Sequence, residues 1–512
     1  MYSSEDIIKR YQSAMTERSQ FQSIFDDCYD LALPRRMSIS DTTVGQARNE
    51  RIFDETAVSG TQEFASKLQA GLVPSFSSWA ELRAGMEFPD RRERDRINRE
   101  LSPVTQFVFE NIHASNFSSQ THESFLDLAI GTGNLLCEET QSSEKPFTFT
   151  AIGIPHYVMD TDPSGNVWGM FRKRKMKWRD IPIEYPRSTN LPAKYSPDQM
   201  VEILDVVTRD RTSNEEKYMR RVCTMGKEDI LTEEYKGEGS NPYITFRWSK
   251  IPMERYGRGP LMDCLPSIKT LNLTVQLILE NAQMAISGMY NVEDDGILNA
   301  DTIQLVPGAL IPHAPGAQGL RPIAAAGRFD VAQLILQEFR QNIKRALFLD
   351  MLGDPDKTPA SATEVAARQA DLAARIGSSF ARLHDEFVEP VIKRCIYIMR
   401  RKGLIDLPEV NGQQVKIVAT SPLAQRFQQE DVMNYVNYAQ ALNQLYGPQI
   451  TTAILDQQKG AEFLADRFTV DPQLNRTEED QAAYMQMIQE AMQQNPEGAQ
   501  QAVKSAGPKA VA

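Results

Sequence analysis

One apolar repeat constrains this chain more than any other feature, because it predicts a single very long helix over residues 358–403. Ser361 and Glu364 have the spacing of a capping box at its start, and the apolar residues recur mostly three or four apart. At 1.5 Å per residue, residues 361–402 would extend roughly 60 Å. A helix longer than a small domain is wide must be a spine on which several other elements pack.

Two further signals shape this predicted spine helix. Residues 400–402 are cations at the C-terminal end of the predicted helix, where a helix carries partial negative charge. Gly403 can then end the helix in a left-handed conformation. Pro390 lies inside the repeat and should kink the helix, because proline has no N–H to donate to the carbonyl four residues back.

The composition is that of a globular protein with an acidic surface. The 512 residues are 41% hydrophobic and 24% charged, which allows about three domains with ample cores. A net charge of −12 argues against a surface that clings as a whole to DNA or anionic lipid. We expect no signal peptide and no membrane span, and we interpret the five scattered cysteines as reduced, buried residues of a protein made inside a cell.

Helices dominate the first quarter of the chain, and a period of two dominates the second. The N-terminal region predicts helices over residues 2–33 and 51–72, a helix pair within 90–118, and a glycine-broken helix over 124–136. Alternating apolar residues over 137–250 predict a mainly β module, with turn chemistry at Asp162–Gly165.

Two long helices then flank a segment rich in glycine and proline. The helices are expected at residues 260–287, which are poor in charge, and at 330–351, with short strands and turns over 289–323 between them. This pattern predicts a stalk with a small tip. The spine helix is followed by a predicted hairpin, further helices and a disordered tail (residues 409–419 with an Asn411-Gly412 turn, 424–469, 477–494 and 495–512). The predicted fold class is α+β, mainly α.

We find no motif for catalysis or for a cofactor in the sequence. The glycines at 131–133 and 257–259 lack the lysine of a phosphate-binding loop. Asp160–Gly165 begins like a calcium loop, but Phe171 stands where that loop needs a bidentate glutamate, so we interpret the stretch as a turn. The five histidines lack metal-ligand spacing, and His384 is interpreted as a polar-face or interface residue. The sequence therefore predicts no catalytic residue, no metal and no cofactor.

The strongest basic run, Arg172–Arg179, has two interpretations. Its cations can contact phosphates, or they can guard an exposed strand edge against mispairing. We favour the strand edge.

The order of these elements resembles that of the portal proteins of short-tailed double-stranded DNA phages, the head-to-tail connectors. The resemblance covers nearly the whole chain up to residue 470. Local stretches that add to it, in the order of the family, are Ile52–Ala57, Leu72–Pro74 followed by Trp79, Gly131–Glu138, Tyr256–Pro260, Thr363–Val365 and Ser421–Ala424.

The resemblance implies a division of the chain into the regions of a portal subunit. These are a wing (1–257, with a helical region over 1–136 and the β module over 137–250), stem helix 1 (258–287), a clip (288–328), stem helix 2 (329–352), a channel loop (353–360), the spine helix with a wing hairpin (361–424), a crown (425–494) and a disordered tail (495–512).

The resemblance also implies a function. In that family a ring of about twelve subunits occupies one capsid vertex, and the genome is packaged and later ejected through its channel. The chain would then be a non-enzymatic virion protein that assembles in the host cytoplasm. Its expected partners are further copies of itself, double-stranded DNA bound without sequence specificity, the terminase large subunit, a tail adaptor, the scaffolding and major capsid proteins and internal core proteins, with no membrane among them.

Two alternatives remain open from the sequence. One is another oligomeric virion connector, such as a tail adaptor. The other is a DNA-processing enzyme whose catalytic groups lie far apart in the sequence. A ring with an axial hole of DNA width would separate the portal interpretation from both.

The resemblance places one short acidic loop at the narrowest region of the channel. Its residues are Gly353, Asp354, Pro355, Asp356, Lys357 and Thr358. With Asp350, the region carries three aspartates against one lysine, a net of 3 − 1 = 2 negative charges per subunit. A channel should not hold its cargo, because tight phosphate contacts would stall the DNA. Lys344 and Arg345, one or two turns earlier, are candidates for a compensating cationic ring.

Replacing Asp354 and Asp356 with lysine should leave ring assembly unchanged, because exposed charges contribute only about 0–1 kcal/mol each to stability. The added cations should slow DNA passage, and added salt should weaken the effect. Packaging and ejection rates at low and high salt measure this, with the two asparagine substitutions as the charge-neutral control. Normal rates for the lysine variant at low salt, or a loss of rings, would contradict this placement of the loop.

Overall fold

The computed structural model describes residues 4–37, 39, 49–84, 91–188, 194–210, 216–287, 290–291, 321–322, 329–349, 377–406, 415–447, 451 and 454–467. The chain divides into two compact units. The first comprises residues 1–77 and 111–404, and the second comprises residues 78–110 and 405–512. Each unit is therefore assembled from segments that are distant in the sequence.

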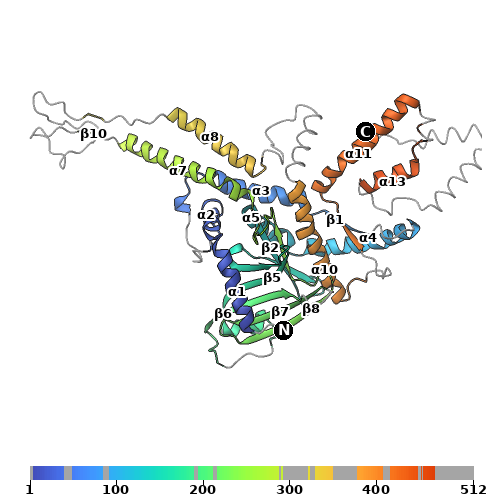
Figure 1. Ribbon diagram of the computed structural model, residues 1–512, viewed down its shortest axis with the longest axis horizontal. Helices are drawn as coiled ribbons and strands as arrows, with labels where there is room; N and C mark the ends of the chain where they lie inside the picture. The colour runs from blue at the N-terminus through green and yellow to red at the C-terminus, as the bar shows by residue number, and fades with distance from the viewer. Residues whose placement is uncertain are drawn as a thin grey trace, which may run out of the picture. The chain divides into compact units, whose positions relative to one another are not determined.

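Two antiparallel sheets form the centre of the first unit (Figure 1). One has the strand order β4-β5-β6-β7-β8 and the other the order β3-β2-β9. Their strands are β2 (Thr132–Glu139), β3 (Phe147–Ala151), β4 (Tyr157–Thr161), β5 (Val167–Lys177), β6 (Met200–Arg209), β7 (Lys217–Thr224), β8 (Asp229–Lys236) and β9 (Tyr243–Arg247). The period of two in the sequence predicted this β-rich region, although its first strand starts at Thr132 and not at Cys137.

The predicted helix over residues 124–136 is wrong in its second half. Helix α5 (Phe117–Ile130) ends at Gly131, and β2 begins one residue later. A Cβ on Gly131 would lie 2.1 Å from the carbonyl oxygen of Gly257, and a Cβ on Gly259 would lie 2.3 Å from that of Ala129. The glycines therefore mark a close approach of two backbones, which allows a sharp change from helix to strand.

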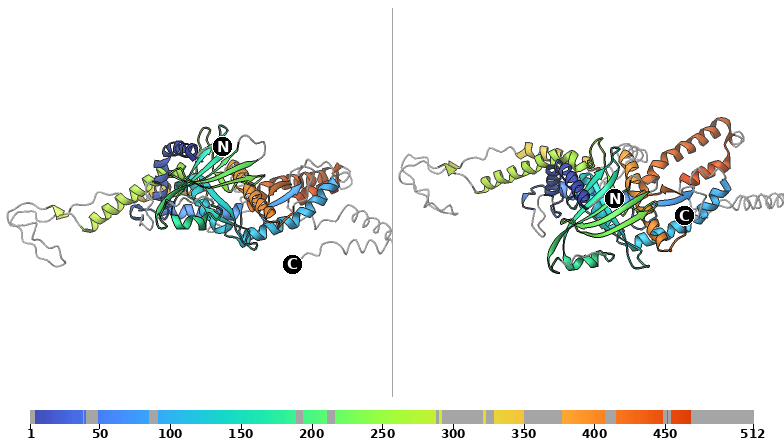
Figure 2. Two further views of the ribbon diagram at one scale, coloured as in Figure 1. Left: turned by 90° about the horizontal axis from the view of Figure 1, so that it is seen from below. Right: turned by 60° about the horizontal axis from the view of Figure 1, so that its bottom comes forward.

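The N-terminal helices also differ from the prediction. The single helix expected over residues 2–33 is two helices, α1 (Ser4–Ser19) and α2 (Gln22–Ala32). The apolar face of α1 covers the five-stranded sheet, where Ile7, Ile8, Tyr11 and Ala14 pack on buried residues of β4, β5 and β6 (Figure 2). Helix α3 (Thr56–Leu72) starts five residues later than predicted, because residues 51–55 form a connection to other helices.

The two long helices of the predicted stalk are present and lie side by side (Figures 1 and 2). Helix α7 spans Pro260–Ser287, as predicted, and α8 spans Phe329–Ala346, which is shorter than the predicted 330–351. Between them the short strands β10 (Tyr290–Asn291) and β11 (Arg321–Pro322) pair in antiparallel register. The remainder of the predicted tip lies outside the described residues.

The described portion of the predicted spine helix runs from residue 377 to Arg401. A π-helical segment, His384–Val388, precedes helix α10 (Glu389–Arg401). The sequence predicted a kink at Pro390, and the structure has a π-helical segment directly before this residue, which is one of the usual places for a helix to kink. Gly403 has a φ of 69° and ends the helix in the left-handed conformation that was predicted.

In the second unit, strand β1 (Ala80–Ala84) pairs antiparallel with β12 (Val415–Ala419). Trp79 is buried and packs edge-on against Phe109, on the long helix α4 (Arg91–Ala114), with 5.0 Å between ring centroids. The expected helix pair within 90–118 is thus one helix, followed by α5. Helices α11 (Pro422–Tyr446) and α13 (Gln457–Arg467) contact each other through Tyr435 and Phe463. The predicted Asn411-Gly412 turn, the helix over 477–494 and the tail over 495–512 lie outside the described residues.

All five cysteines are buried and free, as predicted. Within the described ranges, no helix has the length and apolar character that are needed to cross a membrane.

Candidate functional site

The predicted channel loop, residues 353–360, lies outside the described portion of the chain, and so does Asp350. Lys344 and Arg345 are described: both lie near the C-terminal end of α8 and reach solvent. The structure therefore gives the two flanks of the loop region, which are the end of α8 at Leu349 and the helix whose first described residue is 377. The contacts that hold these two flanks in place therefore fix the two ends of the segment between them.

A tight turn ends α8 earlier than the sequence predicted. The N–H of Phe348 donates to the carbonyl of Arg345 at 3.1 Å, and the N–H of Leu349 donates to that of Lys344 at 3.0 Å. These two bonds form a Schellman motif. Phe348 takes the left-handed position with a φ of 58°, which costs a residue with a Cβ roughly 1–2 kcal/mol. Its ring packs on Trp248 at 5.6 Å, so tertiary contact offsets the backbone strain.

Helix α3 holds this turn from one side. Lys67 donates through Nζ to the carbonyl of Leu349 at 2.9 Å. Leu347 and Leu349 are buried, and a Cβ on Gly60 would lie 2.9 Å from Cδ1 of Leu347. The glycine thus lets α3 approach the turn closely, and the chain leaves α8 from a fixed position.

The stretch Ile52–Ala57 ties α7 to α8. Asn272 of α7 accepts through Oδ1 from the N–H of Phe53 at 2.7 Å and donates through Nδ2 to the carbonyl of Arg51 at 2.9 Å. Asp54 accepts from Nη2 of Arg340, on α8, at 2.8 Å and from the N–H of Thr56 at 2.9 Å. One loop therefore contacts both long helices, through Asn272 of α7 and Arg340 of α8.

Asp54 makes this connection sensitive to acid. Partial burial opposes its ionisation, but the bonds from Thr56 and Arg340 outweigh burial and hold the pKa of this carboxyl below its usual value. A depressed pKa in the folded state gives a stabilisation that is complete at neutral pH and is lost as the pH falls through the depressed pKa.

The spine helix is fixed to β9 by a buried ion pair. Nη2 of Arg247 donates to Oε1 of Glu386 at 2.6 Å, and its Nε and backbone N–H donate to Oε2 at 3.2 and 2.9 Å. Nη1 donates to the carbonyl of Gly165 at 2.9 Å. The side chain of Arg247 is 3% exposed and that of Glu386 is 21% exposed. The pair joins the π-helical segment, strand β9 and the Asp162–Gly165 turn at one point.

Aromatic packing surrounds this ion pair. Phe387, the next residue on the helix, lies 4.5 Å from Phe246 and 5.3 Å from Phe125 between ring centroids. Further along the helix, Arg394 donates to the carbonyls of Cys137 and Ser240 at 3.1 and 2.9 Å, and Lys402 donates to that of Thr140 at 2.6 Å. The helix is therefore attached along its length to the three-stranded sheet and its loops.

A second buried ion cluster joins the two sheets. Arg220 of β7 donates to both carboxylate oxygens of Asp205, at 3.0 and 2.7 Å, and to Glu138 of β2 at 3.0 Å. Burial opposes ionisation of Asp205, but the Arg220 guanidinium outweighs it and lowers the pKa of that carboxyl. Ion pairs thus join both sheets and the spine helix into one frame.

Carboxylates match much of the basic run, which lies on β5 and the turn that follows it. Lys173 pairs with Glu202 at 2.8 Å, Arg174 with Glu184 at 2.6 Å and Arg179 with Asp198 at 2.8 Å. The register with β4 ends at Arg172, whereas the register with β6 continues to Lys177. Among the described residues, the end of the run therefore lies on a strand edge without a second partner strand, as favoured from the sequence.

Two of the buried thiols are unsuited to nucleophilic chemistry. Burial raises the pKa of Cys264 to about 12 and that of Cys223 to about 12. The reactive form of a cysteine is the thiolate, so both groups are inert at neutral pH.

The two sheets, the spine helix and the long helices α7 and α8 all belong to the first unit of the chain. The chain belongs to the family of bacteriophage head to tail connecting proteins, whose model matches residues 4–475. It is therefore a head-to-tail connector of the portal type, and the predictions of the family and of a non-enzymatic role are confirmed.

Curated relatives agree with this assignment. The probable portal protein of Bordetella phage BPP-1 is 23% identical over 499 residues, which cover 91% of this chain and 88% of that protein. The portal protein of Salmonella phage epsilon15 is 24% identical over 449 residues, which cover 82% of this chain and 79% of that protein. The portal protein of Escherichia phage T7 is 18% identical over 416 residues, with 79% and 76% covered.

Replacing Glu386 with alanine should loosen the spine helix, because Arg247 would stay buried without its counter-ion. Removing one partner of such a pair costs about 3 kcal/mol, so hydrogen exchange of amides in 384–401 should accelerate roughly 100-fold.

The matched control is Glu254→Ala. Glu254 pairs with Arg258 at 2.7 Å as an i,i+4 pair that is partly exposed to water, so its loss should cost about 0.5 kcal/mol. Equal exchange rates in the two variants would contradict the anchoring role of Glu386.

Proposed function

We propose that this protein is the portal subunit of a short-tailed phage. Copies of the chain form a ring of about twelve at one capsid vertex, and double-stranded DNA enters and later leaves through the axial channel. The ring docks the terminase motor during packaging and a tail adaptor afterwards. It assembles in the host cytoplasm with scaffolding and major capsid proteins and remains in the virion.

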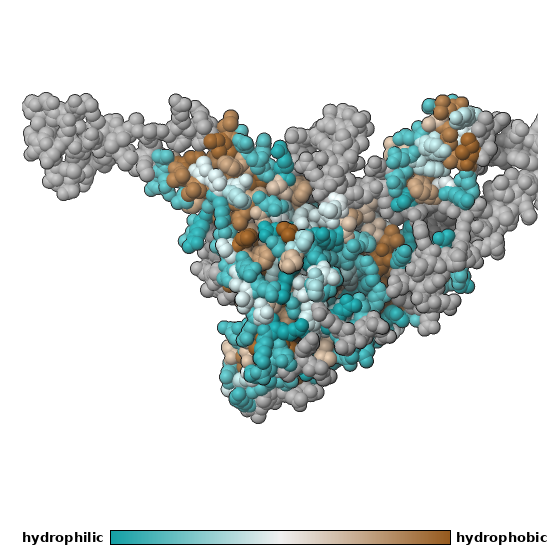
Figure 3. Space-filling model, viewed as in Figure 1, coloured by the Kyte–Doolittle hydropathy of each residue, from teal (hydrophilic) through white to brown (hydrophobic). Residues whose placement is uncertain are grey.

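The observation that carries the ring is the exposed apolar surface of α7 and α8, which is visible in Figure 3. On α7, Leu273, Leu277 and Leu279 are 53%, 51% and 52% exposed, and on α8 Leu334 is 69% exposed. Covering the exposed half of such a side chain contributes roughly 1 kcal/mol. Neighbouring copies in a ring bring the same two helices together and cover this surface many times over.

The proposed channel loop is supported by the anchors at its two flanks. The end of α8 is held by Lys67, and the spine helix is held by Arg247. Both anchors belong to the same compact unit, so the segment between them is restrained at both ends. Lys344 and Arg345 lie near the end of α8, where the loop segment begins, and they reach solvent. This position suits a cationic ring that compensates the acidic loop.

The proposed regions of the subunit follow the division that the resemblance implies. Residues 1–257 with 361–424 form the wing, 258–287 and 329–352 the stem, 288–328 the clip and 425–494 the crown. Pairing of β10 with β11 brings the two ends of the clip segment together, which supports a compact tip that docks the motor and the tail.

Leu277→Glu should disrupt the ring without unfolding the subunit. Leu277 is half exposed in the single subunit, so a glutamate there stays in water. In a ring, about twelve such charges would be buried without partners, each at a cost of several kcal/mol. Light scattering at micromolar concentration should show large assemblies for the natural protein and single subunits for the variant.

The control is Ile183→Glu on the short helix α6 (Ile181–Glu184), where Ile183 is 78% exposed. This variant should assemble normally, because α6 lies outside the proposed stem. Normal assembly of the Leu277→Glu variant would refute the stem interface. Loss of assembly in both variants would show that a charge on any exposed apolar residue disrupts the ring, and this result would also contradict a specific stem interface.

A further inference from the structure

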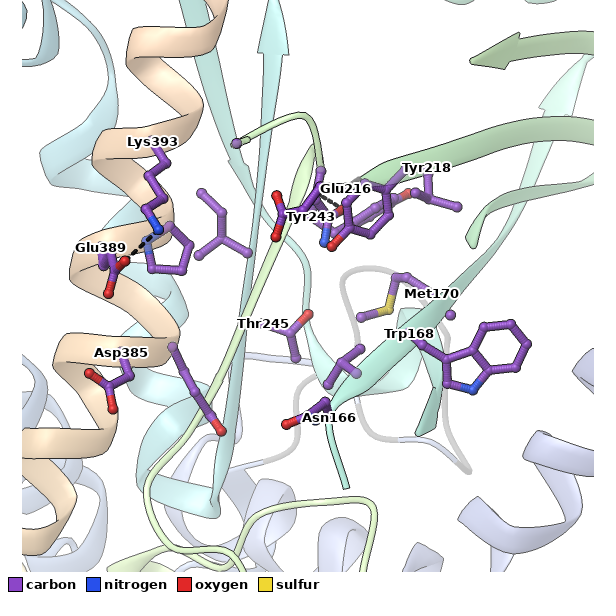
Figure 4. A pocket seen from close by; sticks show the side chains of 18 of the residues that line it. Asn166, Trp168, Met170, Glu216, Tyr218, Tyr243, Thr245, Asp385, Glu389 and Lys393 are labelled. Atoms are coloured by element: carbon purple, nitrogen blue, oxygen red, sulfur yellow. Dashed lines mark hydrogen bonds and ion pairs between the residues drawn. The ribbon is translucent and has the colours of Figure 1, made fainter. Parts of the chain in front are cut away.

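A cavity of about 320 Å³ lies between the spine helix and the strands of the first unit (Figure 4). Asp385, Glu389 and Lys393 line it from the helix, whereas Trp168 and Thr245 belong to strands on the other side. Neither the predicted sites nor the proposed function assigns a role to this cavity.

The charges around the cavity do not balance. Its lining includes four carboxylates, from Glu216, Asp385, Glu386 and Glu389, against two cations, from Arg247 and Lys393, a net of 2 − 4 = −2. Arg247 is committed to Glu386, and Lys393 bridges Glu389 at 2.5 Å and Glu238 at 2.6 Å. The surplus negative charge therefore falls on Asp385 and Glu216, and Glu389 shares its lysine with Glu238.

A buried polar group on the same cavity also lacks a partner. Tyr243 lines the cavity and is 3% exposed. Among the described residues, nothing forms a hydrogen bond with its hydroxyl. Buried polar groups of this kind usually have a partner in the protein, an ordered water or an ion. The cavity thus has a net negative lining and a buried hydroxyl that lacks a hydrogen bond among the described residues.

The π turn assembles three potential ligands at this place. The N–H of Glu389 donates to the carbonyl of His384, five residues back, so Glu389 lies one turn above His384. In a regular α-helix the residue above His384 would be Val388, and Glu389 would be rotated by about 100° from that position. One donor atom each from His384, Asp385 and Glu389 lies within 4.8 Å of the others.

We propose that His384, Asp385 and Glu389 bind one divalent transition-metal ion, such as Zn²⁺ or Mn²⁺, at the edge of this cavity. One imidazole nitrogen with two carboxylate oxygens suits such an ion better than Mg²⁺ or Ca²⁺, which prefer oxygen ligands alone. Its charge matches the surplus of the cavity lining. The second carboxylate oxygen of Glu389 remains with Lys393.

The ion would stabilise the π turn directly, because it links residues 384 and 389 across it. That turn carries Glu386 and Phe387, which attach the spine helix to β9. The site lies within one subunit, so the proposal does not depend on ring formation. A spacing of one and five residues is not a metal-ligand spacing on a regular helix, which is why the sequence predicted no metal here.

Calorimetric titration of tag-free, full-length protein, first treated with a chelator, tests this proposal. We expect the natural protein to bind one Zn²⁺ or Mn²⁺ per subunit. His384→Asn and Asp385→Asn should each weaken binding by about tenfold or more. The matched control is His122→Asn on α5, which should bind as the natural protein does. Co²⁺ provides a second readout, since its visible spectrum reports nitrogen and oxygen ligation in the natural protein and changes in His384→Asn.

Three results would overturn the site. These are no ion bound by the natural protein, unchanged binding in both ligand variants, or Ca²⁺ and Mg²⁺ binding as tightly as Zn²⁺. Asp385 is 75% exposed, so Asp385→Asn should fold even if the more buried His384 does not tolerate substitution. Far-ultraviolet circular dichroism of each variant confirms that a loss of binding is not a loss of fold.

Discussion

The ion pair between Arg247 and Glu386 is the interaction on which the rest of the first unit depends. Arg247 is 3% exposed, so the loss of its partner would leave a buried charge uncompensated and would destabilise the fold. The spine helix is therefore held where Glu386 contacts β9. The Phe387, Phe246 and Phe125 rings then fill the space beside the pair. Charge fixes the position of the helix, and burial of the aromatic rings adds to its stabilisation.

A second anchor acts at the other flank of the acidic loop segment, in the turn after α8. Lys67 holds the carbonyl of Leu349, and Phe348 accepts a strained conformation to pack on Trp248. Trp248 directly follows Arg247 in the sequence. Adjacent residues at the end of β9 therefore contact both flanks of the acidic loop segment, which couples the proposed stem to the spine helix.

The sequence predicted the long regular elements well and the special turns poorly. Pro260–Ser287 and the left-handed end at Gly403 follow from periodicity and glycine chemistry, which are local. The α8 end at Phe348 was missed because a left-handed phenylalanine has no local signal and depends on Trp248. The change to strand after Ile130 was missed because Gly131 serves a contact with Gly257, which is distant in the sequence. The π turn at His384 brings ligands together by a hydrogen bond that no spacing rule anticipates.

Electron microscopy of the purified protein tests the central claim most directly. We expect closed rings of about twelve copies, with an axial hole as wide as duplex DNA and with paired helices from each subunit forming the stem around it. Isolated subunits of 57.8 kDa at micromolar concentration, or rings in which α7 and α8 face outward away from the axis, would contradict it.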